Sequence, residues 1–161
     1  MRLMVTSHAN VISKRIFTRT YMYNKSVFFP CVVLFKNGDF NACSNEVSLS
    51  SYSEIFIDNG SLDYAKVIDI YGNMFFIDNV IKLRNKNILP KFFVRYTKRI
   101  VQVSFTLNFI EQLDVNQMKE YIIFSLQSNQ KLFLHYKELG ILQWIKGAES
   151  YMEIIESLGI D

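Results

Sequence analysis

The sequence has few of the residues that interrupt or cross-link a fold. Its 161 residues include two cysteines, two prolines and six glycines. Two cysteines, Cys31 and Cys43, are too few for the disulfide framework of a small secreted domain. They fall on segments that we expect to be neighbouring strands, so a bridge between them is geometrically conceivable. We expect buried free thiols instead, because free cysteine behaves as a small hydrophobe.

Segments long and apolar enough to enter a membrane are also missing. The apolar stretch at 27–35 has nine residues, whereas a membrane-spanning helix needs about 20. The first ten residues lack the apolar region and the small-residue cleavage site of a signal peptide. We therefore expect a cytoplasmic protein that has no membrane partner.

Motifs for catalysis and cofactor binding are scarce. Neither G-x-G-x-x-G nor G-x-x-x-x-G-K-S/T occurs, so nucleotide chemistry has no support. The two histidines, His8 and His135, have no evident catalytic partner, and Cys31 and Cys43 are not spaced as zinc ligands. Any two of the fifteen acidic residues could meet as a glycosidase pair, but no pattern selects one. We expect no catalytic residues, no cofactor, no metal and no enzyme activity.

Hydrophobic residues, in contrast, make up half of the chain, and aromatic residues make up 15%. This content excludes a disordered protein, because disordered chains lack enough apolar surface to offset chain entropy. The length fits one domain covering residues 1–161. Strand-like segments come first and helix-like segments follow, with the change near residue 110. This order predicts an α+β fold, with an antiparallel β-sheet in the first two thirds and a group of helices at 111–161.

The strand predictions depend on β-branched and aromatic runs and on turn signals. Asn37-Gly38 predicts a type I′ hairpin turn. Pro30 suggests that its strand lies at a sheet edge or carries a bulge, because proline cannot donate to the ladder. A second hairpin is expected around Gly72-Asn73. The expected strands cover 15–23, 27–35, a return strand from 40, 54–58, 64–71, 74–83, and one or two strands within 92–109.

The helix predictions begin at Asp114, whose side chain can accept hydrogen bonds from the first free amides. Gln117 completes a capping-box pattern three residues later. An apolar face at helical spacing follows at Met118, Ile122 and Leu126. Three more helices are expected at 129–139, 141–146 and 147–158, and the last should place Met152, Ile155 and Leu158 on its apolar side.

Charge is distributed in blocks along the chain. Residues 1–38 carry six bases and no acid, and residues 82–110 carry seven bases and no acid. Between them, residues 39–81 carry seven acids and one base, Lys66. Such blocks can form surface patches of opposite sign that steer a partner. They can also neutralise one another where neighbouring strands bring them together, and the sequence leaves both outcomes open.

Nucleic-acid binding is the alternative function that the sequence offers. Segment 82–99 interleaves seven basic residues with Phe92, Phe93 and Tyr96, and such a mixture can neutralise phosphates and stack on bases. However, the sequence pI of about 8.8 is below that of a usual nucleic-acid-binding domain. The two phenylalanines also suit a core. We therefore expect a protein partner rather than a nucleic acid.

The layout resembles that of bacterial immunity proteins that neutralise polymorphic toxins, including those of contact-dependent growth inhibition. The similarity covers VIDIYGNMFFIDNVIKL at 67–83, then DVNQMKEYI at 114–122 and AESYMEIIESL at 148–158. It implies stoichiometric binding of a cognate toxin domain, often a nuclease with a basic substrate-binding surface. An acidic patch could then mimic phosphate charge. The candidates lie in the most loop-like part of the acidic block, where plain solvation is the competing interpretation: Glu46, Glu54, Asp58 and Asp63.

Overall fold

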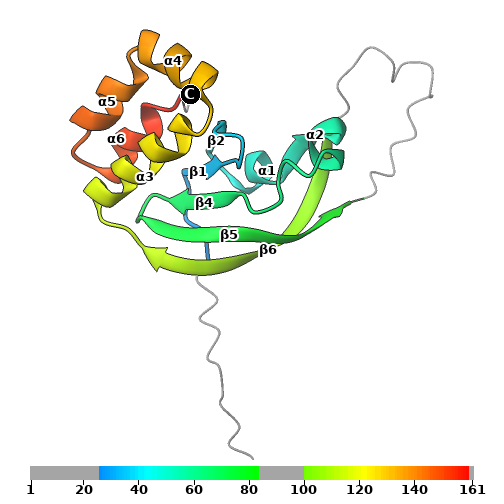
Figure 1. The fold of residues 1–161 in the computed structure, drawn as a ribbon. Coiled ribbons are helices and arrows are strands. Elements are labelled where there is room, and N and C mark those ends of the chain that lie inside the picture. Colours follow the sequence, from blue (N-terminus) through cyan, green and yellow to red (C-terminus); the bar gives the residue numbers. More distant parts are fainter. Residues whose placement is uncertain (1–25, 84–99, 160–161) are drawn as a thin grey trace, which may run out of the picture.

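The computed structural model describes residues 26–83 and 100–159 (Figure 1). Its elements in chain order are β1 (Cys31–Leu34), β2 (Phe40–Cys43), α1 (Glu46–Leu49), β3 (Ser51–Ser53), α2 (Glu54–Asp58), β4 (Lys66–Asp69), β5 (Asn73–Lys82), β6 (Ile100–Gln112), α3 (Val115–Gln127), α4 (Gln130–Glu138), α5 (Ile141–Gly147) and α6 (Tyr151–Glu156). An antiparallel sheet followed by helices confirms the α+β class. The strands expected at 15–23 and at 92–99 lie outside the described residues.

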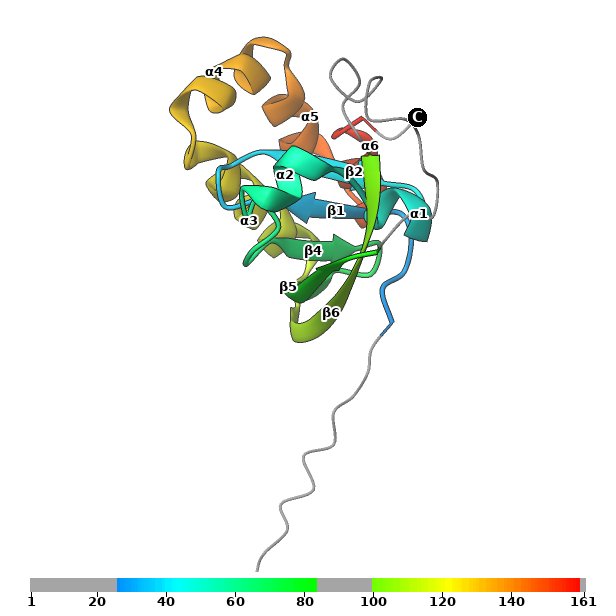
Figure 2. The same ribbon diagram turned by 90° about the vertical axis from the view of Figure 1, so that its right-hand side faces the viewer.

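The six strands form one curled sheet in the order β2-β1-β4-β5-β6-β3, and every neighbouring pair is antiparallel. The long strand β6 follows β5 and then bends toward α2, where it pairs with the short edge strand β3 (Figures 1 and 2). Helix α1 connects β2 to β3, which are the two ends of this strand order. The curl therefore brings both ends of the sheet toward α1 and α2.

Alternating side chains give the sheet two buried faces, as the two-residue period of a strand requires. Val32, Leu34 and Ile68 pack with the C-terminal helices, which bury Met118, Ile122 and Leu126 of α3 as expected. The other face of the same strands packs against α1, β3 and α2. In Figure 1, α3 to α6 form a group at one end of the sheet, away from α1 and α2.

The hairpin expected around Gly72-Asn73 is confirmed as β4 and β5. Buried Asp69 organises its turn: the carboxylate accepts hydrogen bonds from the amides of Tyr71 and Asn73, both at 2.9 Å. The Asn73 side chain donates to both carboxylate oxygens, and the amide of Phe28 donates at 3.3 Å. These donors satisfy a carboxylate that would be costly to bury alone.

The β1–β2 hairpin is also confirmed, but two details of its prediction are wrong. Within the connection between the two strands, Gly38 alone has a positive φ, of 79°, whereas a type I′ turn needs two such residues. The connection has five residues, 35–39, rather than two. In this connection the Gly38 amide donates to the backbone carbonyl of Phe35 at 3.0 Å, and the Phe35 amide donates to the backbone carbonyl of Asp39 at 2.9 Å. The strand β1 is also an interior strand of the sheet, not an edge strand. It tolerates Pro30 because the proline precedes the strand and therefore removes no ladder hydrogen bond.

The strand predicted at 54–58 is wrong, because this segment forms helix α2. Ser53 caps the helix by accepting from the Phe56 amide, and this local hydrogen bond favours helix over strand. The four C-terminal helices were expected, including the Asp114–Gln117 capping box of α3, although α6 is shorter than the range 147–158. Helix α1 was not predicted. In α6, however, Ile154 and Ile155 face the core, whereas Met152 is 36% exposed.

Candidate protein-binding surface

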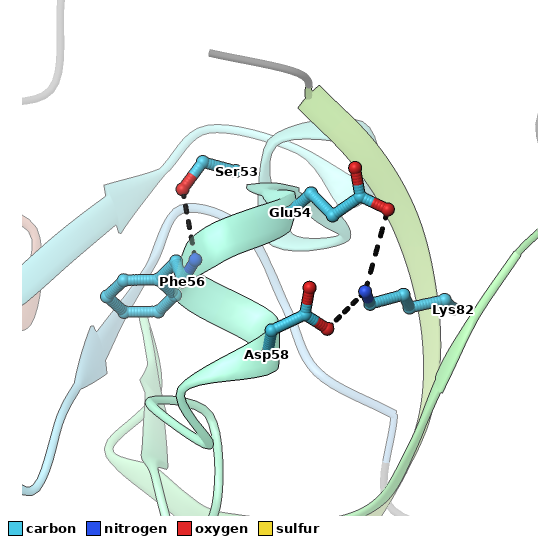
Figure 3. A network of polar contacts seen from close by, with 5 residues as sticks. All are labelled: Ser53, Glu54, Phe56, Asp58 and Lys82. Carbon is cyan, nitrogen blue, oxygen red and sulfur yellow. Dashed lines mark hydrogen bonds and ion pairs between the residues drawn. The ribbon is translucent and has the colours of Figure 1, made fainter.

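Helix α2 is held in place from its inner side. The Phe56 ring lies 4.8 Å from the Phe35 ring, centroid to centroid, and stacks on the Tyr52 ring at 5.8 Å. The Ser53 hydroxyl caps the first turn, as Figure 3 shows. Because these contacts fix both the position and the rotation of the helix, Glu54 and Asp58 are held on its outer side, one helical turn apart.

Lys82 at the end of β5 joins these two carboxylates (Figure 3). Its ammonium nitrogen lies 3.6 Å from Glu54 Oε1 and forms a closer ion pair with Asp58 Oδ1. The hydrogen bond to Asp58, with the charges of both carboxylates, raises the pKa of Lys82. The acidic block and the second basic block therefore meet here, so part of the segregated charge is neutralised.

The other two candidates stand apart from this ion-paired group. Glu46 is the first residue of α1, which precedes β3 in the chain, and it is exposed. Asp63 is exposed in the turn after α2, where its amide donates to the carbonyl of Gly60 at 3.0 Å. We call Glu46, Glu54, Asp58 and Asp63 the acidic surface. All four lie between the start of α1 and the start of β4, but the structure brings only Glu54 and Asp58 into one cluster.

Two apolar side chains accompany these acids, and the sequence analysis missed them. Val47 of α1 is 63% exposed and Ile55 of α2 is 68% exposed. Each follows a candidate acid directly, Glu46 or Glu54. Their signal was weak because a single apolar residue in a helix of four or five residues gives no periodicity. Exposed apolar side chains surrounded by charged ones are typical of protein interfaces.

Two further acids of the same block do not belong to the acidic surface. Asp69 is fully buried in the β4–β5 turn. Asp39 accepts a hydrogen bond from the Tyr136 hydroxyl at 3.0 Å, which ties the β1–β2 hairpin to α4. Burial, together with this hydrogen bond to Asp39, raises the pKa of Tyr136 to about 12. The count of acids in the sequence therefore overstates the charge that a partner can meet.

The two thiols form a buried hydrogen-bonded pair, in which the contact with Cys31 lowers the pKa of Cys43, but no solvent reaches either sulfur. Cys31 and Cys43 are free and fully buried, as expected, and they face each other across β1 and β2. The hydrogen bond to Cys43 and burial raise the pKa of Cys31, so its thiol stays protonated. The neighbouring Tyr52 hydroxyl is buried and has no hydrogen-bond partner in the described part of the chain.

Other candidate groups are dispersed. His135 is exposed on α4, and His8 lies outside the described residues. In ranges 26–83 and 100–159, no three histidine, cysteine or acidic side chains converge in a way that could hold a metal ion. No helix in those ranges is long and apolar enough to span a membrane. Of the basic segment 82–99, the structure describes Lys82 and Leu83.

Comparisons with protein family models, with curated proteins and with solved structures found no match to this chain.

Proposed function

We propose that the protein binds another protein stoichiometrically through the acidic surface, and that it acts as an immunity protein for a cognate toxin domain. The observation that carries the proposal is that Val47 and Ile55 are exposed on two short helices, each directly after a candidate carboxylate in the sequence. Burial of apolar side chains in an interface releases water and stabilises the complex, while the charged rim determines orientation and partner choice.

The charge of this surface indicates what kind of partner fits. Four carboxylates and the Lys82 ammonium leave a net charge of −3 among these five described residues. A basic partner surface, such as the substrate-binding face of a nuclease, would be attracted over a Debye length of about 8–10 Å at physiological salt. Attraction of this kind accelerates association more than it tightens the final complex.

The proposed mechanism is occlusion. A surface that covers the toxin's substrate-binding face blocks access without any chemical step by the inhibitor. The two α2 carboxylates occupy fixed positions one turn apart, and preorganised charges lose little conformational entropy on binding. The resemblance to immunity proteins supports the same interpretation; its segments correspond to β4–β5, to the start of α3 and to α6 with its flanks.

Nucleic-acid binding through segment 82–99 is the second candidate. Its first basic residue, Lys82, is engaged by two carboxylates rather than presented alone to solvent. A phosphate approaching Lys82 would also meet Glu54 and Asp58, which repel it. An electrophoretic shift of a labelled oligonucleotide that weakens steeply with salt would favour this candidate over protein binding.

The test is co-expression with the product of the gene immediately upstream. We expect rescue of cell growth and co-purification of both proteins in equal amounts. A charge reversal at Glu46→Lys should weaken rescue, whereas Glu138→Lys, on the exposed side of α4, should not. Absence of both rescue and complex would contradict the proposal, and so would equal loss of rescue in the two variants.

A further inference from the structure

A small groove lies between the β1–β2 hairpin, the turn that leads into β4 and helix α3, and none of the four acidic residues lines it. Its volume is about 230 Å³. Aromatic and basic side chains dominate its lining: Lys36, Tyr64, Lys66, Tyr121 and Phe124. No carboxylate lines it among the residues that the structure describes.

The groove is built rather than incidental. At its hairpin end, a Cβ on Gly38 would lie 2.5 Å from Ser128 Oγ and 2.9 Å from the Ser125 carbonyl oxygen, so the hairpin tip touches the last turns of α3. Elsewhere in the lining, the Lys66 ammonium donates a hydrogen bond to the Tyr121 hydroxyl and lies 4.9 Å from that ring's centroid. Both contacts hold the walls in place before any ligand arrives.

Two aromatic rings on the walls remain unburied. Tyr64 is 75% exposed and Phe124 is 74% exposed. Tyr64 also has a φ of 63°, a conformation that a residue with a Cβ rarely adopts. Strained residues that expose a large side chain are frequent at binding sites, where the surrounding structure maintains the strain.

Size and charge together select the occupant. Pockets for cofactors and drug-sized ligands usually exceed about 300 Å³, so this groove fits one protruding side chain rather than a cofactor. Lys36 and Lys66 attract negative charge. The acids nearest to these lysines in sequence do not line the groove. Asp39 accepts a hydrogen bond from the Tyr136 hydroxyl, and the carboxylate of Asp63 lies toward Gly60.

We propose that the groove binds an acidic segment of a partner protein, with an aromatic side chain inserted between Tyr64 and Phe124 and flanking carboxylates paired with Lys36 and Lys66. This inference goes beyond the proposed function, since it uses different residues and the opposite charge. Tyrosine, arginine and other large side chains at the centre of a small pocket commonly dominate the energetics of such contacts.

The test is an NMR titration of the isotope-labelled full chain with the peptide acetyl-EDFDE-amide. We expect amide shifts confined to the residues around the groove. The charge-reversed peptide acetyl-KRFRK-amide should produce none of these shifts. Lys36→Gln should weaken binding of the acidic peptide by about twofold to fivefold, as expected for loss of one exposed ion pair.

A pair of variants separates the groove from general stickiness. Phe124→Ser should abolish the shifts, whereas Leu134→Ser, which removes an exposed apolar side chain from α4, should leave them unchanged. The proposal is overturned if no shifts occur at the highest peptide concentration, if both peptides bind alike, or if Phe124→Ser retains binding. If the amide shifts of the groove residues change with protein concentration in the absence of peptide, a second copy of this chain occupies the groove. That result would also overturn the proposal.

Discussion

Gly72 joins the sheet to the helices, and its replacement by alanine gives a sharp test of the fold. Its φ is 74°, and a Cβ there would lie 2.3 Å from the Leu113 carbonyl oxygen and 2.7 Å from Tyr151 Cε1. The same carbonyl accepts from the Tyr151 hydroxyl, and the Leu113 amide donates to the Gly72 carbonyl at 2.9 Å. Added volume must therefore move backbone as well as a side chain.

Gly140 provides the matched control. Its φ is 76°, nearly the same, but no atom lies within 4 Å of a Cβ added there. Gly140→Ala should cost only the left-handed conformation, about 1 kcal/mol. Gly72→Ala should cost a further 2–4 kcal/mol or so, from overpacking and from weakening two hydrogen bonds. We expect a total near 3–5 kcal/mol for Gly72→Ala on that basis.

The assay is equilibrium unfolding in urea, followed by far-UV circular dichroism. The midpoint should fall much further for Gly72→Ala than for Gly140→Ala, with the slope unchanged in both. A thermal midpoint lowered by roughly 10 °C or more is expected for Gly72→Ala. Equal destabilisation by the two substitutions would refute the close approach of the β4–β5 turn to α3 and α6.

Three other predictions follow from the packing and the titratable groups. Ile122→Ala in α3 should lower the free energy of unfolding by about 2–5 kcal/mol, measured in urea, and a change below ~1 kcal/mol would show that α3 does not seal this core. Tyr136 should contribute pH-dependent stability that is present below pH 10, the unfolded-state pKa, and is lost toward pH 12; Tyr136→Phe should remove this dependence, and an unaltered pH profile would contradict it. Cys31 and Cys43 should react with a thiol reagent only when the protein unfolds, so rapid labelling of the native protein would contradict their burial.

The fold was predictable where local signals and hydrophobic pattern agreed. Gly38 and Gly72 mark real hairpins, and the Asp114 capping box with the spacing of Met118 and Ile122 defines α3. At these places, turn chemistry, capping and burial all favour the same structure. The buried thiols were also predictable, because free cysteine behaves as a small hydrophobe and both lie on segments expected to be strands.

The errors have a common physical origin. Residues 54–58 contain isoleucine and phenylalanine, which favour a strand, but the Ser53 cap and the aromatic contacts of Phe56 select a helix. Pro30 appeared to weaken a strand because its position relative to the first ladder pair is not visible in sequence. Neither the long-range contacts nor the strand order can be obtained from periodicity alone.

The candidate surface could be predicted only in part. The sequence located Glu46, Glu54, Asp58 and Asp63 within the acidic block, but it could not reveal that Lys82 bridges two of them. That ion pair depends on the end of β5 lying beside α2, which is a tertiary relationship. Exposure of Val47 and Ile55 likewise depends on which side of each short helix faces the core.

The proposed function depends on the binding of a basic protein partner by the acidic surface. The most direct measurement is the association rate constant between this protein and the product of the upstream gene, as a function of salt, for the wild type, Glu46→Lys and the control Glu138→Lys. We expect an association rate constant that falls steeply with salt, a further decrease for Glu46→Lys, and wild-type rates for Glu138→Lys. Association that is independent of salt, or identical in the two variants, would contradict it.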